Sequence, residues 1–95
     1  MSADTIIRRR AVVGSRVGLH ARPAALIAQR AAALEASVRI GRDSRDPVDA
    51  RSPLLLMTLG AACGDEVVVE AAGERAADAV GEIVALVESD LDASP

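Results

Sequence analysis

Residues 18–25 read Gly-Leu-His-Ala-Arg-Pro-Ala-Ala, and this stretch decides how the first half of the chain folds. It places the only histidine, His20, where a loop becomes a predicted helix over residues 20–34. Gly18 permits a sharp backbone turn before that helix, and Pro23 suits its first turn, where a missing amide costs nothing. Apolar residues then recur every three or four positions and give the helix one apolar stripe: Ala24, Ile27, Ala28, Ala31 and Leu34.

On both sides of this helix, short segments of alternating apolar residues predict strands. The expected strands cover residues 5–13, 37–41, 47–51 and 65–71, the middle two being joined as a hairpin by the polar loop 42–46. Two further helices are expected, over residues 53–59 and 75–91. Ser52 and Pro53 have the residue types that open a helix, and Gly60 is of the type that closes one.

The order β-α-β-β-α-β-α predicts an α+β fold of two layers, a four-stranded antiparallel sheet with three helices on one face. A length of 95 residues supports one domain over residues 1–95, with its core in about residues 5–91. A hydrophobic content of 51% is typical of a folded domain and argues against intrinsic disorder. Because none is aromatic, the core must be aliphatic, and the stacking platforms of most single-stranded nucleic-acid binders are absent.

The charges are unevenly distributed along the chain, and all eleven basic residues are arginine. Residues 1–51 hold ten arginines and five acids, a charge of +5, whereas residues 52–95 hold one arginine and nine acids, a charge of −8. This asymmetry reflects either compositional drift or a basic face that meets acidic or phosphate-bearing partners.

Cysteine usage and the N-terminal sequence both bear on where the protein works. The single Cys63 excludes an intrachain disulfide and a Cys-rich zinc site, which favours a reducing setting. The N-terminal sequence MSADTIIRRR carries charge where a signal peptide needs an apolar core. The longest uncharged run, residues 52–64, is shorter than the ~18 residues of a membrane helix. We therefore expect a cytoplasmic protein with no membrane insertion.

His20 combines with its surroundings to predict chemistry on phosphate. A neutral imidazole nitrogen is a competent nucleophile, and the positive end of a helix disfavours the imidazolium form. The same helix end binds anions, and Arg22 adds a fixed positive charge two residues later. One arrangement could thus supply a nucleophile before phosphoryl transfer and an anion site after it. A plain surface histidine or helix cap is the alternative.

The chain lacks the parts that a stand-alone kinase needs. It contains no lysine, hence no P-loop motif, and no obvious motif of paired metal-binding carboxylates. We expect neither a cofactor nor a metal. A donor protein would have to phosphorylate His20 and an acceptor to remove the group, so a relay protein is favoured over an enzyme with its own activity.

The segment GLHARPAA at 18–25, followed by RSPLLLMTLGAACGDEVVVEA at 51–71, resembles the HPr family. These are the histidine-containing phosphocarriers of the bacterial phosphoenolpyruvate-dependent sugar phosphotransferase system, with an open-faced β-sandwich fold. The resemblance covers about residues 8–91. It implies that enzyme I, with phosphoenolpyruvate as the original donor, phosphorylates His20 on Nδ1 to give the pros-phosphohistidine. The group would then pass to EIIA domains of sugar permeases, and Arg22 would stabilise the phosphohistidine.

The resemblance also implies a regulatory site and a docking surface. Ser52 matches the serine that HPr kinase/phosphorylase modifies in many relatives, although Pro53 replaces their usual bulky aliphatic residue; a plain capping role is the alternative. Leu54 and Met57, three residues apart, would share an exposed face that docks partners, while Leu56 and Leu59 face the core. Three arginines would form a basic rim that steers acidic partners toward His20: Arg22, Arg30 and Arg51.

Other functions remain open at this point. The same fold could serve as a regulatory module that docks a transcriptional regulator through Ser52 and residues 54–57, or as a carrier for a nitrogen-related or single-sugar branch. Arg8, Arg9 and Arg10 suggest a nucleic-acid binder, but their side chains would alternate between the two faces of a strand. With a net charge of −3 we expect no nucleic-acid partner.

Overall fold

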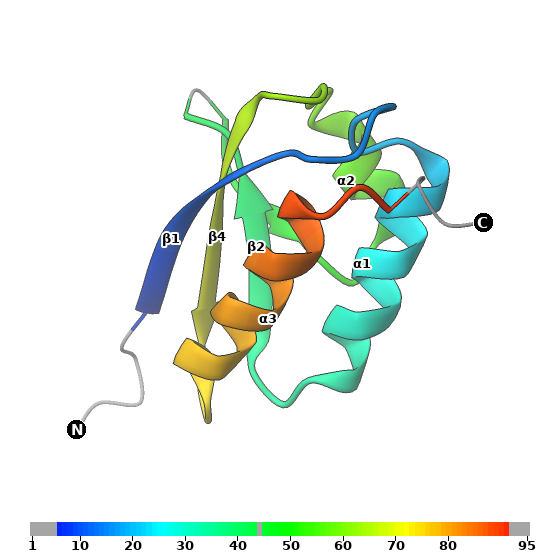
Figure 1. Ribbon diagram of the computed structural model, residues 1–95. Coiled ribbons are helices and arrows are strands. Elements are labelled where there is room, and N and C mark those ends of the chain that lie inside the picture. The colour runs from blue at the N-terminus through cyan, green and yellow to red at the C-terminus, as the bar shows by residue number, and fades with distance from the viewer. Residues whose placement is uncertain (1–5, 44, 92–95) are drawn as a thin grey trace.

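The structure is a computed structural model that describes residues 6–43 and 45–91 (Figure 1). The predicted ends of the domain, residues 1–5 and 92–95, lie outside the described residues. The observed order β-α-β-β-α-β-α is the predicted one. Its elements are β1 (Ile6–Val12), α1 (Ala21–Ala33), β2 (Ser37–Gly41), β3 (Val48–Asp49), α2 (Pro53–Thr58), β4 (Glu66–Ala72) and α3 (Ala76–Glu88).

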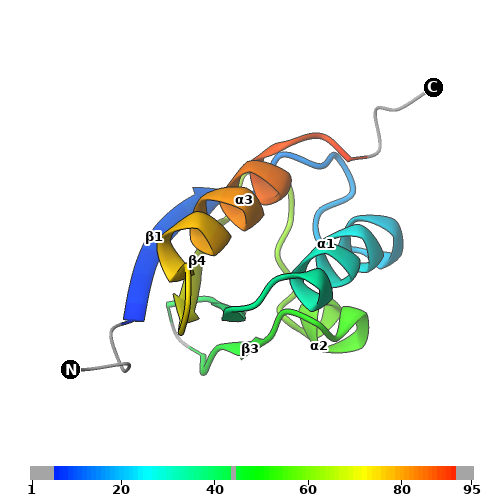
Figure 2. The same cartoon turned by 90° about the horizontal axis from the view of Figure 1, so that it is seen from below.

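The four strands form one antiparallel sheet in the order β1-β4-β2-β3. Register places Ala71 of β4 opposite Ile7 of β1 and Val38 of β2, so these three side chains share the covered face. All three helices lie on that face and leave the other open, which Figure 2 shows from below. The predicted α+β fold of two layers is therefore confirmed.

The core between the sheet and the helices is aliphatic, as the absence of aromatic residues requires. Alternation in β4 buries Val67, Val69 and Ala71, and the apolar stripes of α1 and α3 are buried as well. The largest fully buried aliphatic side chains come from four different elements: Ile27, Ile40, Leu56 and Ile83. Burial of each such side chain stabilises the fold by about 1.5–3 kcal/mol.

The third strand is shorter than predicted, with two residues instead of five. Asp49 ends it, because its Oδ1 accepts a hydrogen bond from the amide of Arg51 at 2.9 Å and its carbonyl accepts one from Ser52 at 3.2 Å. A short polar side chain that bonds the backbone two residues ahead turns the chain. Ala50 is nevertheless buried, whereas Val48 is only half-buried.

Candidate functional site

His20 occupies the N-cap of α1, where its imidazole is exposed to solvent. Its backbone is extended, with φ −92° and ψ −167°, and its carbonyl accepts the first helical hydrogen bond from Ala24 at 2.9 Å. The imidazole does not cap the helix, and it forms no hydrogen bond within the described residues. The ring is therefore within reach of another protein.

The loop that leads to His20 rests directly on the turn after α2. The Leu19 amide donates to the Ala61 carbonyl at 2.9 Å, and the Leu19 side chain is buried. Gly18 has φ +73°, and a Cβ there would lie 2.4 Å from the Ala61 oxygen and 2.9 Å from the Ala62 Cα. Only glycine fits this approach, which explains its place in the sequence before His20.

The other side of this loop is tied to the residues that follow α3. The buried Ser15 hydroxyl donates to the Ser89 carbonyl at 3.2 Å and accepts from the Leu91 amide at 3.1 Å. Arg16 forms an ion pair with Asp90 at 2.9 Å. Because residues 89–91 make these contacts, α3 ends at Glu88, three residues earlier than predicted.

His20 lies in a shallow depression of about 220 Å³ whose lining includes Val17, Met57 and residues 60–62 of the turn after α2. Val17 is 57% exposed, so it presents apolar surface next to the imidazole. Val17 was not among the residues predicted for the site, although its position, an apolar residue in a turn directly before Gly18, is visible in the sequence.

The side chains of residues 52–59 have three roles: one caps α2, some are buried in the core and others lie at the surface. The half-buried Ser52 caps α2, since its Oγ accepts a hydrogen bond from the Leu55 amide at 3.2 Å, and Pro53 follows as the first helical residue. Leu56 and Leu59 are buried, as predicted. On the outside, Leu54 is 70% exposed and Leu55 42%, and Met57 is half-buried beside the His20 depression.

The predicted basic rim is only partly assembled. Arg22 lies exposed on the first turn of α1, two residues after His20. Arg51 forms an ion pair with Asp49 at 2.9 Å, and its hydrogen bonds lower the pKa of the Asp49 carboxyl to about 2. Arg30 forms an ion pair with Glu82 of α3. At 1.5 Å per residue, it lies roughly 15 Å along α1 from His20.

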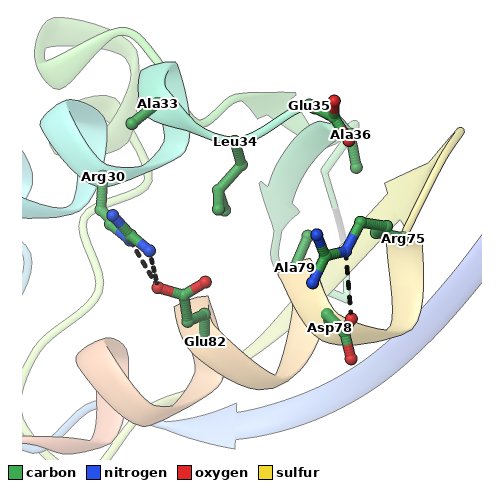
Figure 3. A pocket seen from close by; sticks show the side chains of 9 residues that line it. All are labelled: Arg30, Ala33, Leu34, Glu35, Ala36, Arg75, Asp78, Ala79 and Glu82. Carbon is green, nitrogen blue, oxygen red and sulfur yellow. Dashed lines mark hydrogen bonds and ion pairs between the residues drawn. The ribbon is translucent and has the colours of Figure 1, made fainter.

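A second cavity, of about 200 Å³, lies at the opposite end of α1 (Figure 3). Two ion pairs cross its lining, Arg30 with Glu82 and Arg75 with Asp78. Both arginines of the lining are therefore paired with carboxylates, and none of the lining residues is a histidine, serine or cysteine nucleophile.

The residues described by the structure contain no group of three or more His, Cys, Asp or Glu side chains placed to hold a metal ion. In the same part of the chain, every helix is too short or too polar to cross a bilayer.

Comparison with known proteins identifies the family to which the chain is similar. The family described as "PTS HPr component phosphorylation site" matches residues 7–89. The phosphocarrier protein HPr of Streptomyces coelicolor is 38% identical over 92% of this chain and 94% of its own length. The HPr-like protein Crh of Bacillus subtilis is 33% identical over 90% of this chain and 100% of its own. The crystal structure of HPr from Bacillus anthracis superposes with a TM-score of 0.82 at 31% identity, covering 88% of this chain and 99% of that one.

The match runs from the second residue of β1 to the end of α3 and includes the segment around His20. With its fold and its sequence in agreement, the chain belongs to the HPr family of phosphocarriers of the phosphotransferase system.

Proposed function

We propose that His20 is the residue that carries the phosphoryl group, received from phosphorylated enzyme I and passed to EIIA proteins. One observation supports this proposal above all others. The exposed imidazole of His20 lies at the N-terminus of the 13-residue helix α1 and makes no capping hydrogen bond to that helix. Arg22 follows two residues later. A nucleophile in that place is accessible to a donor and to an acceptor in turn.

The chemistry then needs only this chain's imidazole and two partner proteins. A ring nitrogen lone pair attacks the phosphorus held by enzyme I, so an N–P bond forms as the donor's bond to phosphorus breaks. The nucleophile of EIIA next attacks the same phosphorus, the N–P bond breaks, and the electron pair returns to the ring. By resemblance to the family we assign the attack to Nδ1.

The helix end and Arg22 would stabilise the phosphorylated state modestly. Charge at a helix N-terminus contributes about 0.3–1 kcal/mol when exposed and up to about 2 kcal/mol when partly buried, and the guanidinium adds charge-assisted hydrogen bonds. Since each 1.4 kcal/mol is a factor of about ten in an equilibrium constant, this is enough to favour loading. It is too little to trap the group, which suits a carrier.

Four apolar side chains, in the His20 depression and on α2, form the proposed docking surface: Val17, Leu54, Leu55 and Met57. Val17 and Met57 line the depression together with His20, and Leu54 and Leu55 are exposed on the helix that also carries Met57. Exposed apolar residues that gather on a surface are typical of protein contact sites. Arg30 and Arg51 are engaged with Glu82 and Asp49, so we leave them out of this surface.

We also propose that the chain works in the cytoplasm. Cys63 is exposed and carries a free thiol, a state that persists in a reducing compartment.

Incubation with enzyme I and phosphoenolpyruvate tests the assignment. Intact-mass analysis should show one acid-labile phosphoryl group on the wild-type chain and none on His20→Ala. Arg22→Gln should be phosphorylated more slowly. The matched control is Arg39→Gln, which removes an exposed arginine from the open face of the sheet. A phosphoryl group that persists in His20→Ala would refute the proposal.

Regulation through Ser52 is the second candidate, by HPr kinase/phosphorylase and a transcriptional regulator that reads the modified form. Its Oγ already accepts a hydrogen bond at the N-cap of α2, where added negative charge is electrostatically favourable. Incubation with the kinase and ATP should then phosphorylate the wild-type chain and not Ser52→Ala. An unmodified wild-type chain would leave Ser52 with its capping role alone.

A further inference from the structure

An ion pair outside the His20 site braces the turn on which the His20 loop rests. Arg42 follows β2, and Asp65 precedes β4. The Arg42 Nη2 lies 3.1 Å from the Asp65 Oδ2, and the same oxygen accepts a hydrogen bond from the Ala62 amide at 2.9 Å. Arg42 Nη1 also donates to the carbonyls of Leu59 and Gly60, at 3.2 and 3.0 Å. Together the two side chains bind three peptide groups of residues 59–62.

This turn is mechanically coupled to His20. The Ala61 carbonyl accepts the Leu19 amide, and Gly18 packs so closely on Ala61 and Ala62 that a methyl group does not fit between them. Because the Leu19 side chain is buried, the loop cannot lift away from the turn. A shift of residues 61–62 must therefore displace residues 18–19, and His20 is the next residue.

We infer that Arg42 and Asp65 are positioning residues for phosphoryl transfer at His20. They hold residues 59–62 in place, the Ala61 carbonyl holds Leu19, and Leu19 fixes the imidazole at the start of α1. They are not catalytic residues, since they act only through the backbone of the turn. The inference rests on the proposed function of His20.

The expected effect is on rate more than on stability. Both side chains are about one-third exposed, and partly exposed ion pairs contribute little to the free energy of unfolding. In-line transfer is sensitive to geometry, and a displacement of the nucleophile by about 1 Å can slow a reaction on the order of a hundredfold. Loosening of one support should give a smaller loss, about three- to tenfold.

The test compares Arg42→Gln and Asp65→Asn with the control Arg45→Gln. Arg45 comes from the same loop and donates to the Thr58 carbonyl at 2.8 Å, so it binds the end of α2 without touching Asp65 or the turn beyond Gly60. The first two variants should lower the kcat of phosphorylation by phosphorylated enzyme I about three- to tenfold, with KM within about twofold. The control should stay within about twofold of wild type in both constants.

Two further measurements separate positioning from general destabilisation. The double variant Arg42→Gln/Asp65→Asn should be no slower than the slower single variant, because both changes release the same support. Hydrogen exchange at the Leu19 amide, measured without any partner protein, should accelerate in both single variants and stay unchanged in Arg45→Gln.

Equal kcat values for Arg42→Gln, Asp65→Asn and the control would overturn the inference, as would unchanged exchange at Leu19. If Arg42→Gln fails to fold, Asp65→Asn decides alone. A wild-type chain that accepts no phosphoryl group on His20 would refute the proposed function as well. A wild-type chain that is phosphorylated normally, with variants equal to it, would refute the positioning role only.

Discussion

Substitution of Gly18 by alanine tests whether the loop before His20 is held by direct backbone contact. Gly18 has φ +73°, a conformation that costs a residue with a Cβ about 1–2 kcal/mol. The new Cβ would also lie 2.4 Å from the Ala61 oxygen, a clash that backbone movement must relieve. Overpacking of this kind costs about 1–3 kcal/mol. The two effects together predict a loss of about 2–5 kcal/mol in the free energy of unfolding.

Gly60→Ala is the matched control. Gly60 has φ +63°, close to that of Gly18, but a Cβ there meets no atom within 4 Å. Its substitution should cost only the backbone term of about 1–2 kcal/mol. The difference between the two variants, about 1–3 kcal/mol, isolates the contact with Ala61.

Urea unfolding measures both losses, provided that the m-value is unchanged. For a chain of this length each kcal/mol corresponds to about 4–8 °C in Tm, so Gly18→Ala should melt roughly 4–24 °C below Gly60→Ala. Losses that agree within about 0.5 kcal/mol would show that the loop adapts freely and that the contact does not hold it.

The remaining predictions concern α2 and the hairpin before it. Leu56→Ala should lower the free energy of unfolding by about 2–5 kcal/mol, as measured in urea, because Leu56 is fully buried. Leu54→Ala should change the free energy of unfolding by less than about 0.5 kcal/mol and should raise the KM of phosphorylation by enzyme I. Equal stability losses in the two leucine variants would refute the assignment of Leu56 to the core and Leu54 to the surface. Ser52→Ala should cost about 1 kcal/mol by loss of the cap, and Ser52→Thr much less. The Asp49 carboxyl should titrate near pH 2 in a carbon-13 NMR titration, and Arg51→Gln should return its pKa toward the ordinary 3.8. Because folding lowers this pKa, the ion pair's stabilisation is complete above about pH 4 and is lost as the pH falls through 2.

The helices and longer strands were predictable because each repeats one pattern over many residues. The stripe of α1 and the alternation of β4 determine which side chains are buried, and both were confirmed. The third strand ends earlier than predicted, at Asp49, because the Asp49 carboxylate accepts a hydrogen bond from the Arg51 amide. Such a local bond overrides an alternating pattern that is only five residues long.

The site was predictable where its parts are neighbours in the sequence. His20 and Arg22 lie within one turn of each other on a helix that the pattern already predicted, so their proximity followed. The contact between the Ala61 carbonyl and the Leu19 amide was not predictable, because a backbone hydrogen bond does not require a particular residue type. The pairing of Arg42 with Asp65, 23 positions apart, likewise depends on which loops the sheet brings together.

Isotope labelling of histidine provides the most direct test of the account, because His20 is the only histidine in the chain. A sample that carries nitrogen-15 in histidine alone reports one imidazole by NMR. After incubation with enzyme I and phosphoenolpyruvate, we predict that one ring nitrogen shifts and couples to phosphorus-31, and that addition of EIIA reverses both changes. Incorporation of phosphate with both ring nitrogens unchanged would contradict the assignment of phosphoryl transfer to His20.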